Sequence, residues 1–133
     1  MTEELKNAVK REAALLRANA TQEQLDKINL DDLNGLSAEY CIYGQLTGSC
    51  YNDEARDLFA KCAIPYRRGI YSDFNEGSPE PAEATATCFD EAGEARKQGN
   101  HSAIEYYISL PENEYKLQGL VDFLQNKTNK LIL

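Results

Sequence analysis

The chain has no tryptophan, one methionine and one histidine among its 133 residues, and its four cysteines never stand close together. Structural zinc sites usually take paired ligands about two to four residues apart, whereas the spacing here is C-x8-C-x11-C-x25-C. Ligands distant in sequence can still converge in a fold, but no local pattern indicates a metal site. We therefore predict no metal, and we expect Cys41, Cys50 and Cys62 to be buried as small hydrophobic side chains.

Signatures of catalysis and of cofactor binding are also missing. The chain has no G-x-G-x-x-G fingerprint, no phosphate-loop lysine and no H-E-x-x-H pair. A calcium loop aligned on Gly35 would place Leu30 and Cys41 where its first and last acidic ligands belong. A Cys–His nucleophilic pair would have to use His101, and no cysteine lies in a glycine-flanked strand-to-helix turn that would expose it. We predict no catalytic residue and no cofactor.

Long apolar runs are absent as well. No segment approaches the roughly 20 apolar residues that cross a membrane, and the N-terminus mixes charges through its apolar residues, unlike a signal peptide. These features predict a cytoplasmic protein without membrane contact, whose cysteines are reduced. An apolar share of 42% and a charged share of 27% are ordinary for a soluble globular protein, and the length fits a single domain over residues 1–133.

What is present is helical periodicity, which predicts a mainly α fold with about five or six helices. The first predicted helix covers about Glu3–Ala18, the second is short and is opened by the Thr21–Gln24 capping box, and the third is capped by Ser37 and continues past Gln45. The fourth is capped by Asn52, and its predicted buried stripe is Ala55, Leu58, Phe59 and Cys62. The fifth is opened by Ser102 and Glu105, and the last covers about Asn113–Lys127. Residues 103–110 also alternate as an edge strand would. Residues 66–100 fit a short hairpin, an acidic helix or an irregular segment, and residues 131–133 should dock on the body or on another subunit.

The formal net charge is −8, and most of it lies in one segment. Seven carboxylates follow one another there without an intervening lysine or arginine. Such a surface repels nucleic acid and attracts basic partners, although a merely solvated stretch is the simpler interpretation. The residues of this predicted acidic partner surface are Asp73, Glu76, Glu80, Glu83, Asp90, Glu91 and Glu94.

A second group of candidates could bind a ligand. Arg67 and Arg68 stand between Tyr66 and Tyr71, an arrangement that can grip a phosphate, stack on a base or pair with the acidic segment that follows. Aromatic and amide groups near the middle of the chain could share such a pocket. The complete set of predicted binding residues is Tyr40, Tyr43, Gln45, Arg67 and Arg68.

The segment CIYGQLTGSCYNDEARDLFAKC contains a C-x-Y-G-Q-x-T-G pattern, formed by Cys41, Tyr43, Gly44, Gln45, Thr47 and Gly48. Together with residues 102–128 and the LIL ending, about half of the chain, it resembles a group of short bacteriophage and prophage proteins. No activity is attached to that group, so no functional residue can be transferred. The resemblance implies a phage or another mobile element as the setting, with the host cytoplasm or the virion as the location.

These observations favour a small acidic protein that acts by binding another protein, such as a host or defence factor with a basic surface. One alternative is a virion component or another self-assembling subunit, a homo-oligomer. A further alternative is a small-molecule or nucleotide binder, or an enzyme, that uses the five predicted binding residues around a pocket.

Overall fold

The computed structural model describes residues 3–34, 39–67 and 100–133. Its described part is mainly α, as the periodicity predicts, and contains six α-helices, two short 3-10 helices and one pair of three-residue strands. The α-helices are α1 (Glu3–Asn19), α2 (Gln22–Leu25), α3 (Ile42–Thr47), α4 (Asp53–Cys62), α7 (Ala103–Ile108) and α8 (Glu114–Leu124). The 3-10 helices are η1 (Leu30–Asp32) and η3 (Pro111–Asn113), and the strands are β1 (Pro65–Arg67) and β2 (Asn100–Ser102).

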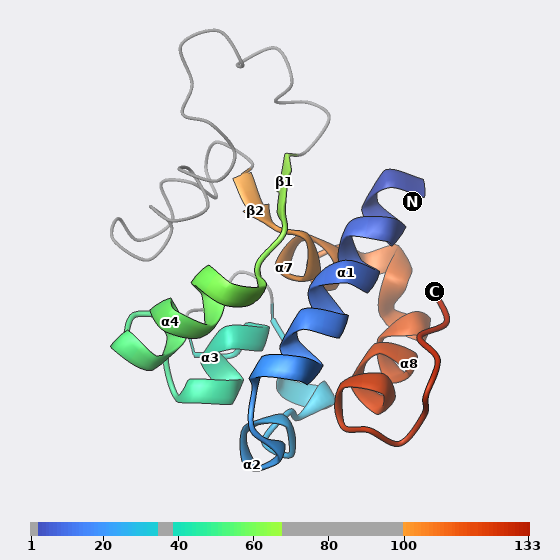
Figure 1. Cartoon of the computed structure of the whole chain (residues 1–133). Helices are drawn as coiled ribbons and strands as arrows, with labels where there is room; N and C mark the ends of the chain where they lie inside the picture. Colours follow the sequence, from blue (N-terminus) through green and yellow to red (C-terminus); the bar gives the residue numbers. More distant parts are fainter. Residues whose placement is uncertain (1–2, 35–38, 68–99) are drawn as a thin grey trace, which may run out of the picture.

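Helix α1 is the central element of the fold. It packs against α4 on one side and against α7 and α8 on the other, while α3 lies against α4 (Figure 1). Of its apolar positions it buries Leu5, Ala8, Val9, Ala13 and Leu16, whereas Leu15 is only partly buried. Burial of a large aliphatic side chain of this kind contributes roughly 1.5–3 kcal/mol, so the stripe of α1 organises the core.

The local signals for helix ends are mostly confirmed. The Thr21 hydroxyl accepts a hydrogen bond from the Gln24 N–H at 3.0 Å, and the Gln24 side chain accepts one from the Thr21 N–H at 2.9 Å, which completes the predicted capping box. Asn52 caps α4 through a bond from the Ala55 N–H at 2.8 Å. Ser102 caps α7 through a bond from the Glu105 N–H at 3.1 Å, so the helical interpretation of this segment is right and the edge strand is wrong.

The helix expected after Ser37 begins later than predicted. Ser37 lies outside the described residues, and α3 starts at Ile42 with Cys41 as its N-cap, where the Cys41 sulfur accepts from the Gly44 N–H at 3.4 Å. The helix ends at Gly48, whose φ of 102° is a left-handed conformation that glycine adopts without strain.

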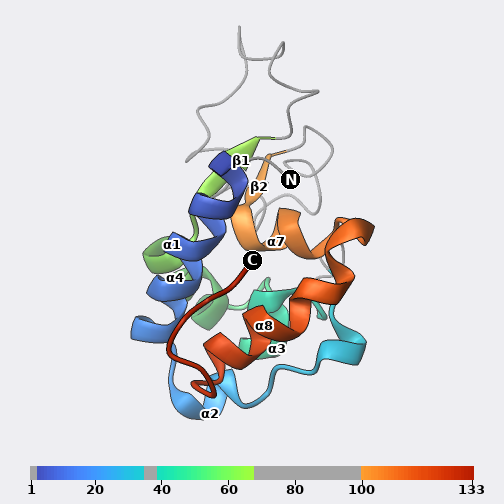
Figure 2. The same ribbon diagram turned by 90° about the vertical axis from the view of Figure 1, so that its right-hand side faces the viewer.

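Strands β1 and β2 pair two segments that are more than 30 residues apart along the chain. They pair antiparallel, with Pro65 opposite Ser102, Tyr66 opposite His101 and Arg67 opposite Asn100 (Figure 2). The strands lie at the two ends of the segment 66–100, for which a short hairpin, an acidic helix or an irregular segment is predicted. Residues 68–99, which include the rest of that segment, lie outside the described residues.

The C-terminal tail docks on the body mainly through Leu131, and the partly buried Leu133 also packs against the core. Leu131 is buried, whereas Ile132 is 71% exposed. The tail passes so close to α8 that a Cβ on Gly119 would stand 3.2 Å from the Ile132 carbonyl oxygen. The predicted docking of residues 131–133 on the body is therefore made mainly by Leu131.

Candidate functional site

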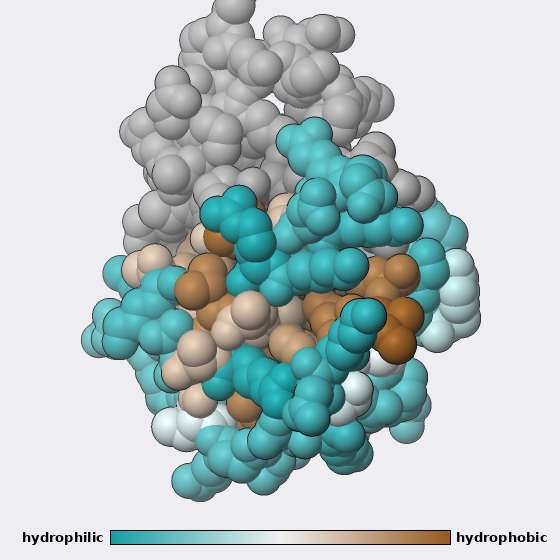
Figure 3. Space-filling view, turned by 45° about the vertical axis from the view of Figure 1, so that its right-hand side comes forward, coloured by the Kyte–Doolittle hydropathy of each residue, from teal (hydrophilic) through white to brown (hydrophobic). Residues whose placement is uncertain are grey.

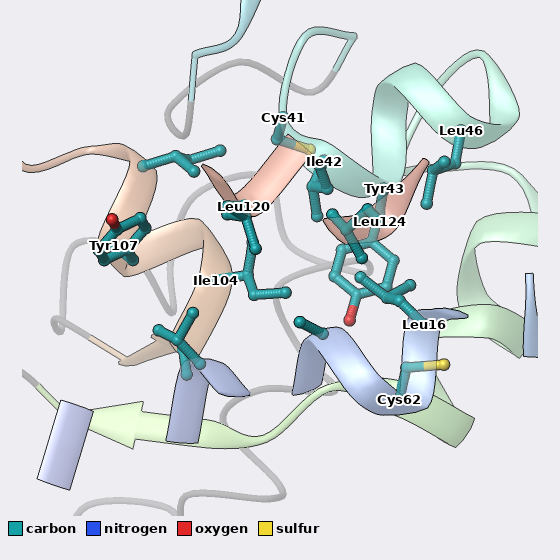
Figure 4. Close-up of a cluster of buried hydrophobic side chains, with 14 of the residues drawn as sticks. Leu16, Cys41, Ile42, Tyr43, Leu46, Cys62, Ile104, Tyr107, Leu120 and Leu124 are labelled. Atoms are coloured by element: carbon teal, nitrogen blue, oxygen red, sulfur yellow. The ribbon is translucent and has the colours of Figure 1, made fainter. Parts of the chain in front are cut away.

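Tyr43, one of the predicted binding residues, lies in the core. Its side chain is fully buried, its ring centroid is 4.8 Å from that of Phe59, and its hydroxyl donates to Glu12 Oε2 at 2.7 Å. Figure 4 shows the hydroxyl end of Tyr43 directed toward α1, among side chains of several helices. A ligand at the surface therefore has no access to Tyr43.

Glu12 is the buried acid that receives this bond, and it joins three elements. Its Oε1 accepts from the backbone N–H of Ile64 at 3.1 Å and from that of Ile104 at 3.2 Å. Burial raises the pKa of Glu12 from 4.5 to about 7, and the hydrogen bonds from Tyr43 and the two backbone N–H groups only partly offset this effect. Because the carboxyl group has no exposed surface, it holds α1 to the segments at Ile64 and Ile104 rather than contacting a substrate.

Gln45, another predicted binding residue, is engaged with the backbone. Its side-chain oxygen accepts from the Asn29 N–H at 2.7 Å, and its amide nitrogen donates to the carbonyls of Asn29 at 3.1 Å and Tyr40 at 3.3 Å. These bonds fix the segment before η1 against α3. Tyr40 itself is 48% exposed, and it lines the same surface hollow as Gln45.

The remaining predicted site residues lie in β1 or outside the described part of the chain. Arg67 lies in β1. Arg68 and all seven residues of the predicted acidic partner surface (Asp73, Glu76, Glu80, Glu83, Asp90, Glu91 and Glu94) lie outside the described residues. Of the five predicted binding residues, the described structure thus brings together only Tyr40 and Gln45.

Two hollows flank η1, and we call the surface that contains them the η1 face. The polar hollow, of about 360 Å³, is lined by Lys27, Asn29, Asp32, Glu39, Tyr40, Gly44, Gln45 and Gly48. The apolar groove, of about 400 Å³, is lined by Leu30, Asp31, Leu33, Ile108, Ser109, Leu110, Pro111, Glu114 and Leu117. Both volumes lie within the range of small ligand sites.

The η1 face is acidic. Asp31 and Glu114 line the apolar groove, Asp32 and Glu39 line the polar hollow, and Lys27 is the only base among the described residues that line either one. The sequence analysis excluded a calcium loop in this segment and predicted no binding residue there. A local signal was the spacing of the leucines in NLDDLNG, because residues three apart in a 3-10 turn lie on the same side, and Leu30 and Leu33 line the groove together.

The described cysteines do not resemble reactive sites. Cys41, Cys50 and Cys62 are buried, as the sequence predicts. A hydrogen bond with Cys50, followed by burial, raises the pKa of the Cys41 thiol, and burial raises that of Cys62 to about 11. Within residues 3–34, 39–67 and 100–133, no group of three or more His, Cys, Asp or Glu side chains is arranged to hold a metal ion.

Comparison with known proteins gives no assignment, because no family model, no curated protein and no solved structure matches the chain. Within the described part of the chain, every helix is too short or too polar to cross a membrane. The geometry of the η1 face is therefore the main basis for a functional proposal.

Proposed function

We propose that the protein acts by binding another protein that presents a basic surface. The observation that carries this proposal is the η1 face, where four carboxylates and one lysine surround two adjoining hollows. Electrostatic complementarity of this kind accelerates encounter with a basic partner and selects against acidic ones. In the phage setting that the sequence resemblance implies, the partner would be a host or defence factor.

The half-exposed Tyr40 supports this proposal. Tyrosine is enriched where proteins bind one another, because its ring adds apolar contact area and its hydroxyl stays hydrated or bonded. Tyr40 stands at the edge of the polar hollow, and its carbonyl is held by the Gln45 side chain. A local backbone fixed before binding reduces the entropy lost on association.

The test is a capture experiment from host lysate with four carboxylates neutralised. The variant Asp31→Asn/Asp32→Asn/Glu39→Gln/Glu114→Gln removes the acidity of the η1 face. A matched control neutralises the same number of exposed carboxylates elsewhere, in Glu3→Gln/Glu4→Gln/Glu23→Gln/Asp57→Asn. We expect the wild type and the control to retain a basic protein at low salt and release it at high salt, and the η1-face variant to lose it.

A captured protein is identified by mass spectrometry, purified and measured by calorimetry against all three chains. Equal affinity of the η1-face variant and the control would place the interaction elsewhere. Recovery of no partner above background at low salt would refute the proposal.

A second candidate function is self-association, favoured by the two large hydrophobic side chains that are most exposed among the described residues. Tyr115 on α8 is 76% exposed and Ile132 is 71% exposed. A Cβ on Gly119, one turn after Tyr115, would stand 3.2 Å from the Ile132 carbonyl oxygen, so the tail backbone runs along the side of α8 that carries Tyr115. On the face that Figure 3 presents, areas of hydrophobic surface lie between polar ones. Light scattering tests this candidate: the wild type should form oligomers that Tyr115→Ser/Ile132→Ser dissociates, and a strictly monomeric wild type at high concentration would exclude it.

A further inference from the structure

We propose that the apolar groove beside η1 receives a lysine or arginine side chain of the partner, with its aliphatic stem on the leucines and its charge beside Asp31 and Glu114. This inference rests on the proposed function, since it names the place where a basic partner is held. The inference adds to the acidity of the η1 face, because the groove requires a ligand that combines an apolar stem with a cation.

The lining of the groove fits an aliphatic stem. Six apolar residues contribute to it: Leu30 and Leu33 from the η1 segment, Ile108 and Leu110 from the end of α7, Pro111 from η3 and Leu117 from α8. Lysine and arginine cover apolar surface with their methylene chains while the charged end remains hydrated. A volume of about 400 Å³ also leaves room for an apolar residue next to the basic one.

The charge of the groove selects the sign of the ligand. Asp31 and Glu114 come from different elements, are both exposed, and line the same groove, whose described lining contains no lysine or arginine. Neither carboxylate takes part in an ion pair with the described residues. An exposed ion pair changes affinity by up to about fivefold, so the carboxylates supply a preference for a cation and the leucines supply apolar contact for its stem.

A small probe tests this chemistry without knowledge of the partner. The probe is n-hexylammonium, followed by amide chemical shifts of the full-length protein in two-dimensional NMR. We expect shifts at the amides of Leu30–Leu33, Ile108–Leu110, Glu114 and Leu117, with a Kd on the order of millimolar, as the small number of heavy atoms allows. Neutral 1-hexanol should bind several-fold more weakly at the same amides, and hexanoate more weakly still.

Two variants separate the contributions of charge and apolar contact. In Asp31→Asn/Glu114→Gln the preference for n-hexylammonium over 1-hexanol should disappear, while the affinity for 1-hexanol is kept. Glu112→Gln changes an exposed carboxylate of η3 that does not line the groove, and it should behave as the wild type. Leu33→Ala, at a partly buried position, should weaken both ligands alike.

The outcomes also separate this inference from the proposed function. Shifts confined to other residues, no shift at saturating probe, or hexanoate binding as tightly as n-hexylammonium would overturn the groove as a cation site. Capture of a basic partner that is lost in the four-carboxylate variant but kept in Asp31→Asn/Glu114→Gln would refute the groove and leave the proposed function standing. Probe binding in the groove without any captured partner would support the groove and refute the proposed function.

Discussion

Glu12 is the residue whose chemistry departs most clearly from that of a surface carboxylate. It lies on the buried stripe of α1, and the structure shows it fully buried among hydrogen-bond donors. Because its folded-state pKa is raised, the folded protein binds a proton more tightly than the unfolded chain does. Stability from this group is therefore complete below pH 4.5 and is lost as the pH rises to about 7.

We expect the pH dependence of unfolding to show this loss directly. A change from 4.5 to about 7 corresponds to about 3 kcal/mol of unfolding free energy. Glu12→Gln keeps a side-chain acceptor but cannot ionise, so its difference in stability from the wild type should change by about this amount across that pH window. Urea unfolding at a series of pH values measures the difference, with Glu4→Gln on the exposed side of α1 as the control. Parallel curves for the wild type and Glu12→Gln would contradict the expectation.

Tyr43 and Tyr107 form a matched pair of buried phenols with opposite expected effects. The Tyr43 hydroxyl donates to Glu12, whereas the Tyr107 hydroxyl is buried without a hydrogen-bond partner among the described residues. We expect Tyr43→Phe to cost about 1–3 kcal/mol, because it removes a donor from a buried carboxyl group. Tyr107→Phe should be neutral or stabilising by about 1 kcal/mol, because it removes an unsatisfied polar atom. If both variants lose the same unfolding free energy in urea, the surroundings of the hydroxyl groups do not decide the change in stability.

At the scale of elements, helix α4 depends on the residue that caps it. Asn52 accepts from the Ala55 N–H at 2.8 Å and donates to the Thr47 carbonyl at 2.9 Å, so it joins the start of α4 to the end of α3. Asn52→Ala should therefore cost about 1–2 kcal/mol of unfolding free energy. Asn52→Asp keeps the capping oxygen and should recover part of the loss.

The control for this cap is Asn7→Ala, on the exposed side of α1. It should change stability by no more than about 0.5 kcal/mol, because it removes no cap and no buried contact. Thermal or urea unfolding that ranks Asn52→Ala with Asn7→Ala would show that the cap contributes little.

The elements that the sequence predicted well are those with a cap and an apolar stripe. A capping residue, an apolar stripe or both are present in residues 3–19, 22–25, 53–62 and 114–124. Local hydrogen bonds fix the ends of these helices. The start of α3 was missed, because Ser37 satisfies the local rule for an N-cap while the cap is made by Cys41, a residue with weak capping preference.

The candidate site was harder to predict than the helices. The η1 face brings residues 30–33 next to residues 108–117, which are far from them along the chain, so a local pattern could not indicate the complete groove. Tyr43 and Gln45 were predicted as binding residues, but tyrosine and glutamine side chains serve binding and structure equally. Which role applies depends on burial and partners, and these are properties of the tertiary structure.

For the whole molecule, the formal net charge of −8 should make stability depend on salt. Like charges repel one another in the folded state, and screening relieves this repulsion. We expect added NaCl up to about 0.5 M to raise the Tm by a few degrees. Choline chloride at equal ionic strength should act similarly, which distinguishes screening from specific ion binding. A Tm that falls with both salts would contradict the expectation.

Because of the paired strands and Glu12, the chain is also suited to an internal deletion. Arg67 and Asn100 face each other across the β1–β2 pair, and Glu12 holds Ile64 and Ile104 on a single carboxylate oxygen. A short glycine-containing turn that joins Arg67 to Asn100 could therefore replace residues 68–99 without drawing the helices apart. We expect this shortened chain to fold cooperatively and to keep the η1 face while lacking all seven carboxylates from Asp73 to Glu94. Its binding to a captured partner would assign the interaction to one of the two acidic regions.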